Sequence, residues 1–256
     1  MAIHDRIRPR PGILDIAPYV GGAATVDGAN RSIKLSANEN PFGPSAKAIE
    51  AYRGMADSLG LYPESHEPLA QAIADVNGIE AERIVLGNGS DELIALLTKA
   101  YAGEGDEVLF SAHGFLMYRL STMAAGATPV TAPETDLTAN VDELIAAMND
   151  RTRLVFVANP NNPTGTMIDA AELTRLADAL PPKAMLVIDA AYAEYLKPAD
   201  NDGALELARS RDNVAMTRTF SKIYGLAAVR LGWCYAPDHV CAVLHRVRGP
   251  FNVTVP

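Results

Sequence analysis

Lys222 has neighbours that suit chemistry with a carbonyl compound. Two hydroxyl residues precede it, Thr219 and Ser221, and Arg230 follows eight positions later. An amine attacks an aldehyde only when it is partly neutral, which requires burial or nearby charges to lower its pKa toward about 7–8. Hydroxyl and guanidinium groups bind phosphate. The stretch predicts a site for a cofactor with both an aldehyde and a phosphate; a surface lysine beside a strand edge is the alternative.

A second candidate anion site follows the apolar run at 84–86. Gly87-Asn88-Gly89-Ser90-Asp91-Glu92 opens a predicted helix, where glycines allow close backbone approach and free N–H groups attract an anion. A dinucleotide motif fails because Glu92 stands in place of the third glycine. Asp91 and Glu92 also fit as ordinary acids of a first helical turn.

Two more polar stretches follow apolar runs. Residues 159–165 hold three asparagines, two prolines and a glycine, which predicts either a tight turn or a rigid loop that presents an amide side chain. Asp189 ends the apolar run at 185–188. It is either a helix cap or a carboxylate that meets a cation, because a buried carboxylate is otherwise costly. A protonated pyridine nitrogen is such a cation, and pyridoxal phosphate carries it together with the aldehyde and the phosphate.

Short apolar runs alternate with helical patterns along the chain, which predicts an α/β fold. Strands are expected at 84–86, 108–110, 128–131, 154–158, 185–189, 214–217 and 231–235. Helices are expected after Ser45 and at 67–76, 91–101, 115–124, 141–148, 170–180 and 238–247. Runs such as 185–188 are apolar on both faces, which indicates a mostly parallel mixed sheet between helix layers. Ligands of such sheets lie beyond the carboxyl ends of the strands, where the polar stretches stand.

Composition excludes several classes of protein. Twenty-two Lys and Arg against 31 Asp and Glu give a net charge of −9, which disfavours nucleic acid and anionic membranes as partners. No apolar run approaches the roughly 20 residues of a membrane span, and the N-terminus lacks a signal core. The spacing of Cys234 and Cys241 fits neither a zinc site nor a redox pair. We expect a cytoplasmic protein with buried free thiols and no metal site.

The motifs together resemble the class I/II aminotransferases, which are pyridoxal-phosphate enzymes of fold type I. The resemblance lies in residues 36–41, 61–63, 87–92, 161–165, 189–192 and 219–230, in the family's order and over nearly the whole chain. Asn-Pro-Thr-Gly, Asp-x-x-Tyr and Ser-Lys followed by arginine are jointly specific. Asn-Glu-Asn-Pro and Tyr-Pro narrow the resemblance to the histidinol-phosphate branch.

The resemblance implies roles around the cofactor ring. Lys222 would bind the cofactor covalently and move a proton between substrate and cofactor. Asp189 would pair with the ring nitrogen, and Tyr192 and Asn162 would bind the ring hydroxyl. Phe115 stands where the family stacks an aromatic side chain, often a tyrosine, on the ring.

The resemblance also implies contacts to the phosphate and the substrate. The expected phosphate ligands are Ser90, Asp91, Thr219, Ser221 and Arg230. Tyr62 would reach the phosphate of the partner subunit's cofactor in a homodimer, and Tyr19 and Asn40 would line the substrate site. Family members continue through a small domain that supplies an arginine for the substrate carboxylate, and this arginine has no counterpart up to Pro256.

The resemblance divides the chain into three parts. Residues 1–44 are an N-terminal arm and small-domain segment, 45–250 the cofactor-binding large domain, and 251–256 the start of a truncated small domain. The implied reaction exchanges an amino group between a small-molecule donor, histidinol phosphate, and the 2-oxo acid 2-oxoglutarate. The alternatives are an aromatic amino-acid aminotransferase, a phosphothreonine-type decarboxylase, a non-catalytic cofactor-binding domain, or a nucleotide-binding domain.

Overall fold

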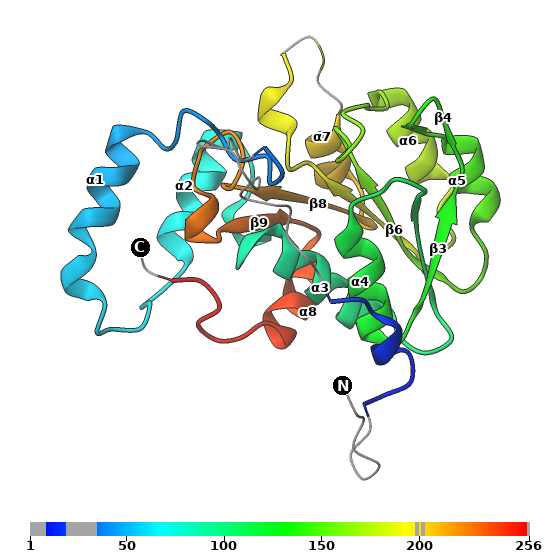
Figure 1. Cartoon of the computed structure of the whole chain (residues 1–256), viewed down its shortest axis with the longest axis horizontal. Helices are drawn as coiled ribbons and strands as arrows, with labels where there is room; N and C mark the ends of the chain where they lie inside the picture. The colour runs from blue at the N-terminus through cyan, green and yellow to red at the C-terminus, as the bar shows by residue number, and fades with distance from the viewer. Residues whose placement is uncertain (1–8, 19–34, 198–199, 201–202, 255–256) are drawn as a thin grey trace, which may run out of the picture.

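The computed structural model describes residues 9–18, 35–197, 200 and 203–254, and a seven-stranded sheet forms its centre (Figure 1). The strand order is β1-β9-β8-β7-β6-β2-β3. The strands are β1 (Ile84–Gly87), β2 (Glu107–Ser111), β3 (Thr128–Ala132), β6 (Thr152–Ala158), β7 (Met185–Asp189), β8 (Val214–Thr219) and β9 (Gly232–Tyr235). A separate hairpin joins β4 (Glu134–Thr135) to β5 (Thr138–Ala139).

The sheet is mostly parallel, as the sequence predicted. β3, β2, β6, β7 and β8 run parallel to one another, whereas β9 is antiparallel to both β8 and β1. Ala158 on β6 pairs with Asp189 on β7, and Asp189 pairs with Thr217 on β8. The carboxyl ends of these three strands therefore meet at one edge, and the segments that follow them lie close together.

Helices cover both faces of the sheet (Figure 1). The helices are α1 (Ala46–Gly54), α2 (Glu67–Asn77), α3 (Gly89–Tyr101), α4 (Leu116–Ala125), α5 (Val141–Ala147), α6 (Ala170–Asp178), α7 (Ala204–Ser210) and α8 (Asp238–Val247). Short 3-10 turns occupy Ile13–Asp15, Ala56–Ser58, Ala81–Arg83, Ala193–Tyr195 and Ala227–Val229. Helices α2, α5, α6 and α7 share one apolar cluster, and α3, α4 and α8 share the other.

Successive residues of a strand pack alternately into these two clusters. On β7, Leu186 and Ile188 enter the first cluster, while Val187 enters the second. All three are fully buried, and each such side chain contributes about 1.5–3 kcal/mol to folding. Cys234 and Cys241 are buried free thiols in the second cluster, as expected.

The structure differs from the predicted elements at a few places. Helix α3 begins at Gly89, two residues earlier than predicted, because the left-handed φ of Gly89 lets the chain turn directly from β1 into the helix. Helix α6 ends at Asp178, two residues early. Helix α7 and the β4–β5 hairpin were not predicted, since both are too short to show a periodic pattern.

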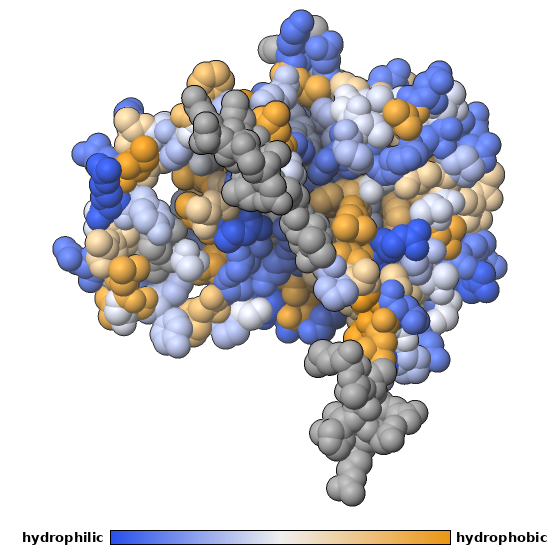
Figure 2. Space-filling model, viewed as in Figure 1, coloured by the Kyte–Doolittle hydropathy of each residue, from blue (hydrophilic) through white to orange (hydrophobic). Residues whose placement is uncertain are grey.

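Helix α1 differs from the other helices because none of its residues is buried. Its start is the predicted one, with the Ser45 hydroxyl accepting a bond from Ala48 N at 3.2 Å. Ile49 and Tyr52 are exposed, and they line a groove between α1 and the body of the molecule, opposite Phe220 and Leu231. Figure 2 shows apolar and polar side chains mixed over α1, at the left of the view.

Among the described residues no helix is both long and apolar enough to span a bilayer.

Candidate active site

A cavity opens at the edge where β6, β7 and β8 end. Ten of the predicted cofactor contacts line it together: Ser90, Asp91, Phe115, Asn162, Asp189, Tyr192, Thr219, Ser221, Lys222 and Arg230. They come from the N-terminus of α3, from the segment before α4, and from the segments after β6, β7 and β8. Segments separated by more than a hundred residues in the chain thus converge on one space.

Arg230 organises one end of the cavity. Its guanidinium donates to Ser221 Oγ at 3.2 Å and pairs with Asp91 Oδ2 at 3.2 Å. The Thr219 hydroxyl accepts a bond from Ser221 N at 3.1 Å and fixes the turn before Lys222. The backbone of Arg230 is left-handed, with φ 56°, a conformation that costs a residue other than glycine about 1 kcal/mol or more. This end offers hydroxyls, a guanidinium and a helix N-terminus, which together suit an anion.

Two glycines allow the close packing of this anion-binding end. A Cβ on Gly89 would stand 2.6 Å from the Arg230 guanidinium, and one on Gly232 would stand 2.5 Å from Ser90 N. Both distances are shorter than any Cβ contact tolerates. The Gly232 contact is with backbone that cannot move aside, so the start of α3 packs against β9 only because Gly232 lacks a side chain. Gly89 meets the mobile end of Arg230, and glycine is favoured there by its φ of +76°.

Asp189 occupies the other end, where it is only 4% exposed. Its Oδ2 accepts a bond from the Tyr118 hydroxyl at 2.9 Å, and its Oδ1 accepts one from Thr217 Oγ1 at 3.2 Å. Burial raises the pKa of Asp189 to about 6, against the lowering effect of these two hydrogen bonds, and the charge of Asp91 raises it further. A cation beside Asp189 would stabilise its ionised form.

Lys222 lies between the two ends and is half-buried. Its Nζ donates to Ala37 O at 3.2 Å and lies 5.6 Å from the centre of the Tyr192 ring. Burial lowers the pKa of Lys222, the nearby Asp91 carboxylate opposes this shift, and the positive charge of Arg230 adds to it. The direction is the one that amine chemistry with an aldehyde requires.

The segment before α1 closes over the lysine. Asn38 Nδ2 donates to the Tyr192 hydroxyl at 2.9 Å, and Asn40 Nδ2 donates to Ile223 O at 2.6 Å. Gly225 has φ +67°, and a Cβ there would stand 2.4 Å from the carbonyl carbon of Gly43. Residues 37–44 therefore pack directly on the turn after Lys222.

The asparagine-rich loop after β6 is held by two of its three asparagines. The Asn159 side chain bonds both backbone groups of Ile168, donating to its carbonyl at 3.0 Å and accepting from its N–H at 2.9 Å. Asn161 Nδ2 donates to Thr164 Oγ1 at 2.8 Å and to His113 O at 3.2 Å. Asn162 is left to line the cavity. This arrangement agrees with the interpretation of a rigid loop that presents one amide side chain.

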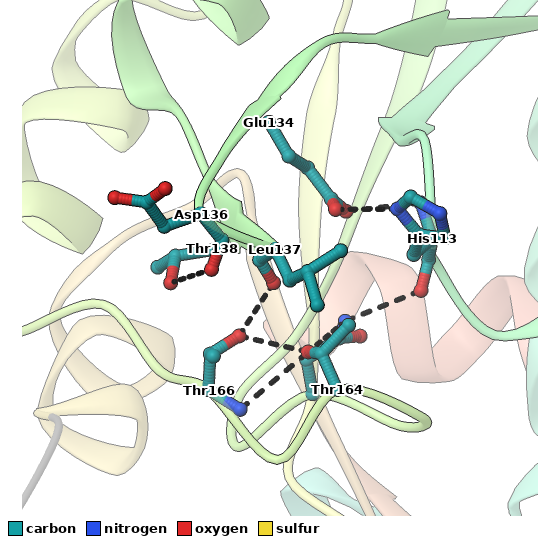
Figure 3. Close-up of polar contacts among 8 residues, drawn as sticks. His113, Glu134, Asp136, Leu137, Thr138, Thr164 and Thr166 are labelled. Carbon is teal, nitrogen blue, oxygen red and sulfur yellow. Dashed lines mark hydrogen bonds and ion pairs between the residues drawn. The ribbon is translucent and has the colours of Figure 1, made fainter.

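Threonines and an acid–histidine pair brace the same loop from outside (Figure 3). Thr164 and Thr166 share a hydroxyl–hydroxyl bond of 2.8 Å, and Thr166 Oγ1 donates to Leu137 O in the β4–β5 turn at 2.8 Å. His113 Nδ1 and Glu134 Oε2 are 2.7 Å apart and point toward one another in Figure 3. The short hairpin thus ties the loop after β6 to the turn before α4.

A family model described as "Aminotransferase class I and II" matches residues 30–256. The histidinol-phosphate aminotransferase of Dinoroseobacter shibae is 58% identical over 250 residues, which are 97% of this chain and 69% of that protein. The enzyme of the same name from Paramagnetospirillum magneticum is 56% identical over 249 residues, again 97% and 69%. The chain belongs to the class I and II aminotransferase family.

Solved structures support the same fold. Histidinol-phosphate aminotransferase from Sinorhizobium meliloti, determined in complex with pyridoxal-5'-phosphate, aligns with a TM-score of 0.81 at 31% identity over 85% of this chain and 60% of that one. An aromatic aminotransferase from Pyrococcus horikoshii aligns with a TM-score of 0.70 at 24% identity, and at that identity the likeness shows the fold alone. The chain spans about two thirds of the curated relatives' length and less of the solved chains.

The structure leaves some predicted aminotransferase contacts apart from the cavity. Tyr62 is 74% exposed and stacks on Phe251 with ring centres 4.4 Å apart. Asn40 contacts Ile223 and accepts a bond from Phe42 N at 2.9 Å, and it does not line the cavity. Tyr19 lies outside the described residues. The roles of these three residues stay predictions.

Sequence reasoning missed two residues beside the site. Asn38 lies in the 36–41 stretch that carries the family resemblance, which predicts no role for it, yet it donates a hydrogen bond to Tyr192. Tyr118 gave no signal, because its position in α4 reads as an ordinary buried helical residue, yet it contacts Asp189. Within the described part of the chain no cluster of three or more metal-ligating side chains occurs.

Proposed function

We propose that the chain is the cofactor-binding part of a histidinol-phosphate aminotransferase that uses pyridoxal phosphate and acts in histidine biosynthesis. The observation that carries this proposal is the position of Lys222 between an anion site around Arg230 and a buried carboxylate at Asp189. Identities of 56–58% to two enzymes of that name, over almost the whole chain, support the choice of substrate.

The residues present fit each polar part of pyridoxal phosphate. Ser90 and Asp91 at the start of α3, with Thr219, Ser221 and Arg230, suit the phosphate. Asp189 suits the protonated ring nitrogen, whose charge would offset the cost of the buried carboxylate. Asn162 and Tyr192 line the side where they would bind the ring hydroxyl, and Phe115 would cover the ring.

When bound, pyridoxal phosphate supplies an aldehyde that captures amines and a ring that withdraws electrons from the substrate carbon. The residues of the chain would position the cofactor and the substrate and move a proton between them. Lys222 would hold the cofactor covalently, and its Nζ would take up and pass on the substrate's proton, which its lowered pKa favours because more of the amine is then neutral. Tyr192, whose hydroxyl accepts a bond from Asn38, keeps its ring beside Lys222.

The wider assembly is also part of the proposal. The amino acceptor would be 2-oxoglutarate, and the protein would work as a cytoplasmic homodimer. The exposed Tyr62 would then reach the phosphate of the cofactor bound by the partner subunit. Residues 1–44 would form the arm and small-domain segment, 45–250 the large domain, and 251–256 the start of the small domain.

A half-reaction assay tests this proposal on the chain itself. The protein is loaded with pyridoxal phosphate and then mixed with histidinol phosphate, phenylalanine or O-phosphothreonine. We expect visible absorbance on loading and its loss with release of a keto compound fastest with histidinol phosphate. Lys222→Ala serves as the control and should show neither attachment nor turnover.

The other outcomes point to the rival functions. A faster reaction with phenylalanine would replace the proposal by an aromatic amino-acid aminotransferase. Release of carbon dioxide from O-phosphothreonine would indicate a decarboxylase. Loading without conversion of any amine would indicate a non-catalytic cofactor-binding domain, and the absence of loading would overturn the use of pyridoxal phosphate.

A further inference from the structure

Tyr118 contacts both Asp189 and an aromatic residue that lines the cavity. Its hydroxyl donates to Asp189 Oδ2 at 2.9 Å, and its ring meets Phe115 edge-on with centres 5.8 Å apart. The residue is fully buried and does not itself line the cavity. It therefore stands directly behind two of the groups that would face the cofactor ring.

The side chains packed around Tyr118 hold its hydroxyl in one direction, toward Asp189. The ring is stacked on Phe156 with centres 4.7 Å apart and planes inclined by 9°, and Phe110 packs on it at 5.9 Å. Gly114 also lies against the ring, since a Cβ there would meet Tyr118 Cδ2 at a contact distance of 3.4 Å. A ring clamped in this way cannot rotate its hydroxyl away from Asp189 without displacing β6 or the turn before α4.

The two carboxylate oxygens of Asp189 have separate donors. Tyr118 serves Oδ2 and Thr217 serves Oδ1, at 2.9 and 3.2 Å. These two hydrogen bonds, together with a third from the backbone N–H of Ala191, fix the plane of the carboxylate. Burial and the Asp189 charge keep the pKa of Tyr118 far above its ordinary value, so its hydroxyl remains a donor at every working pH.

We propose that Tyr118 is a positioning residue that holds the Asp189 carboxylate ionised and oriented toward the cofactor's ring nitrogen, and holds Phe115 over the same ring. This inference rests on the proposed use of pyridoxal phosphate. It gives α4 a role in positioning Asp189, although Tyr118 does not line the cavity.

The other charged groups around Asp189 make the Tyr118 bond more important. Asp91 from α3 opposes ionisation of Asp189, whereas Lys222 after β8 favours it, and Tyr192 after β7 lies close enough to interact. Burial is the largest effect and favours the neutral acid. Besides the charge of Lys222, hydrogen bonds favour the carboxylate, and the bond from Tyr118 lowers the pKa of Asp189 more than the other hydrogen bonds do.

The test compares cofactor affinity across pH 5–8 for the wild type, Tyr118→Phe and the control Tyr101→Phe. Tyr101 has a buried hydroxyl without a partner among the described residues, and it packs against the apolar cluster that contains Tyr118. We expect the midpoint of the pH dependence to move upward by about one unit in Tyr118→Phe, because a hydrogen bond to the charged form is lost. Tyr101→Phe should keep the wild-type midpoint. Thr217→Val should give a smaller upward shift, because its bond is longer.

A second readout needs no cofactor. In the cofactor-free chain, the fall of unfolding free energy with rising pH should extend about one unit higher in Tyr118→Phe than in the wild type. An unchanged midpoint in both readouts, or a loss of affinity that is equal at every pH, would overturn the inference while leaving the proposed function intact. A wild type that binds no cofactor would overturn the proposed function, and the cofactor-free titration would then show whether Tyr118 controls Asp189.

Discussion

Both ends of the cavity hold charged side chains, but their surroundings are opposite. At the Arg230 end the charged side chains stay open to water, with Arg230 44% and Asp91 42% exposed. At the Asp189 end the carboxylate is buried and depends on Tyr118 and Thr217. Water screens the first end, so it suits a ligand group whose charge is permanent and well solvated. The second end loses its charge when a single proton binds to Asp189.

This difference assigns distinct tasks to the two ends. An exposed anion site contributes affinity that salt weakens, whereas a buried carboxylate contributes an interaction that pH controls. Lys222 lies between them, and the charges of both ends act on its amine. Changes at the Asp189 end should therefore affect chemistry most, and changes at the Arg230 end should affect binding.

The largest effect is expected from Asp189→Asn. The amide has the same shape but cannot carry the charge that would pair with a ring nitrogen. Loss of a buried charge partner costs about 3–5 kcal/mol, which corresponds to a turnover decrease of roughly 200- to 5,000-fold. The half-reaction rate with histidinol phosphate measures it. A decrease smaller than that of Arg230→Gln would reverse the assignment of tasks.

The pH dependence of stability should reveal the Asp189 end. Its folded-state pKa of about 6 lies above the ordinary value of 3.8 for an aspartate, so the folded chain binds more protons than the unfolded chain between these values. The unfolding free energy should therefore fall by about 2–3 kcal/mol as pH rises from 4 to 6 and level off above. Denaturation of the cofactor-free chain measures this fall, and Asp189→Asn should lack it.

Arg230→Gln should weaken cofactor binding rather than slow the chemistry. It removes the charge while keeping some hydrogen-bonding capacity, so we expect about 10- to 100-fold lower affinity for pyridoxal phosphate. Affinity measured at two salt concentrations provides the check, since the wild type should lose affinity with salt and the variant should lose less. Equal salt dependence in both proteins would contradict the role of this end.

The smallest effect is expected from Asp91→Asn. Its carboxylate pairs with Arg230 at 3.2 Å, and both groups are exposed, so the pair is worth about 0–1 kcal/mol. Removing the charge should free Arg230 and raise the affinity for pyridoxal phosphate by up to about fivefold. Titration at low salt measures the change, and a loss of affinity would show that Asp91 supports the site rather than competing for Arg230.

Local sequence signals located most of the cavity. Asp189, Asn162 and Lys222 each follow a strand, and the register of β6, β7 and β8 brings these positions to one edge. The antiparallel direction of β9 and its place between β1 and β8 had no local signal, because pairing depends on the whole sheet. Tyr118 and Asn38 were missed for the same reason, since their partners are 71 and 154 residues away.

Covalent trapping at Lys222 tests the central claim most directly. The chain is incubated with pyridoxal phosphate, reduced with borohydride and digested, and the modified peptide is identified by mass spectrometry. The half-buried amine between the two ends predicts a single modified site at Lys222, with none in Lys222→Ala. Modification spread over the exposed lysines, or equal modification of Lys222→Ala, would contradict the account.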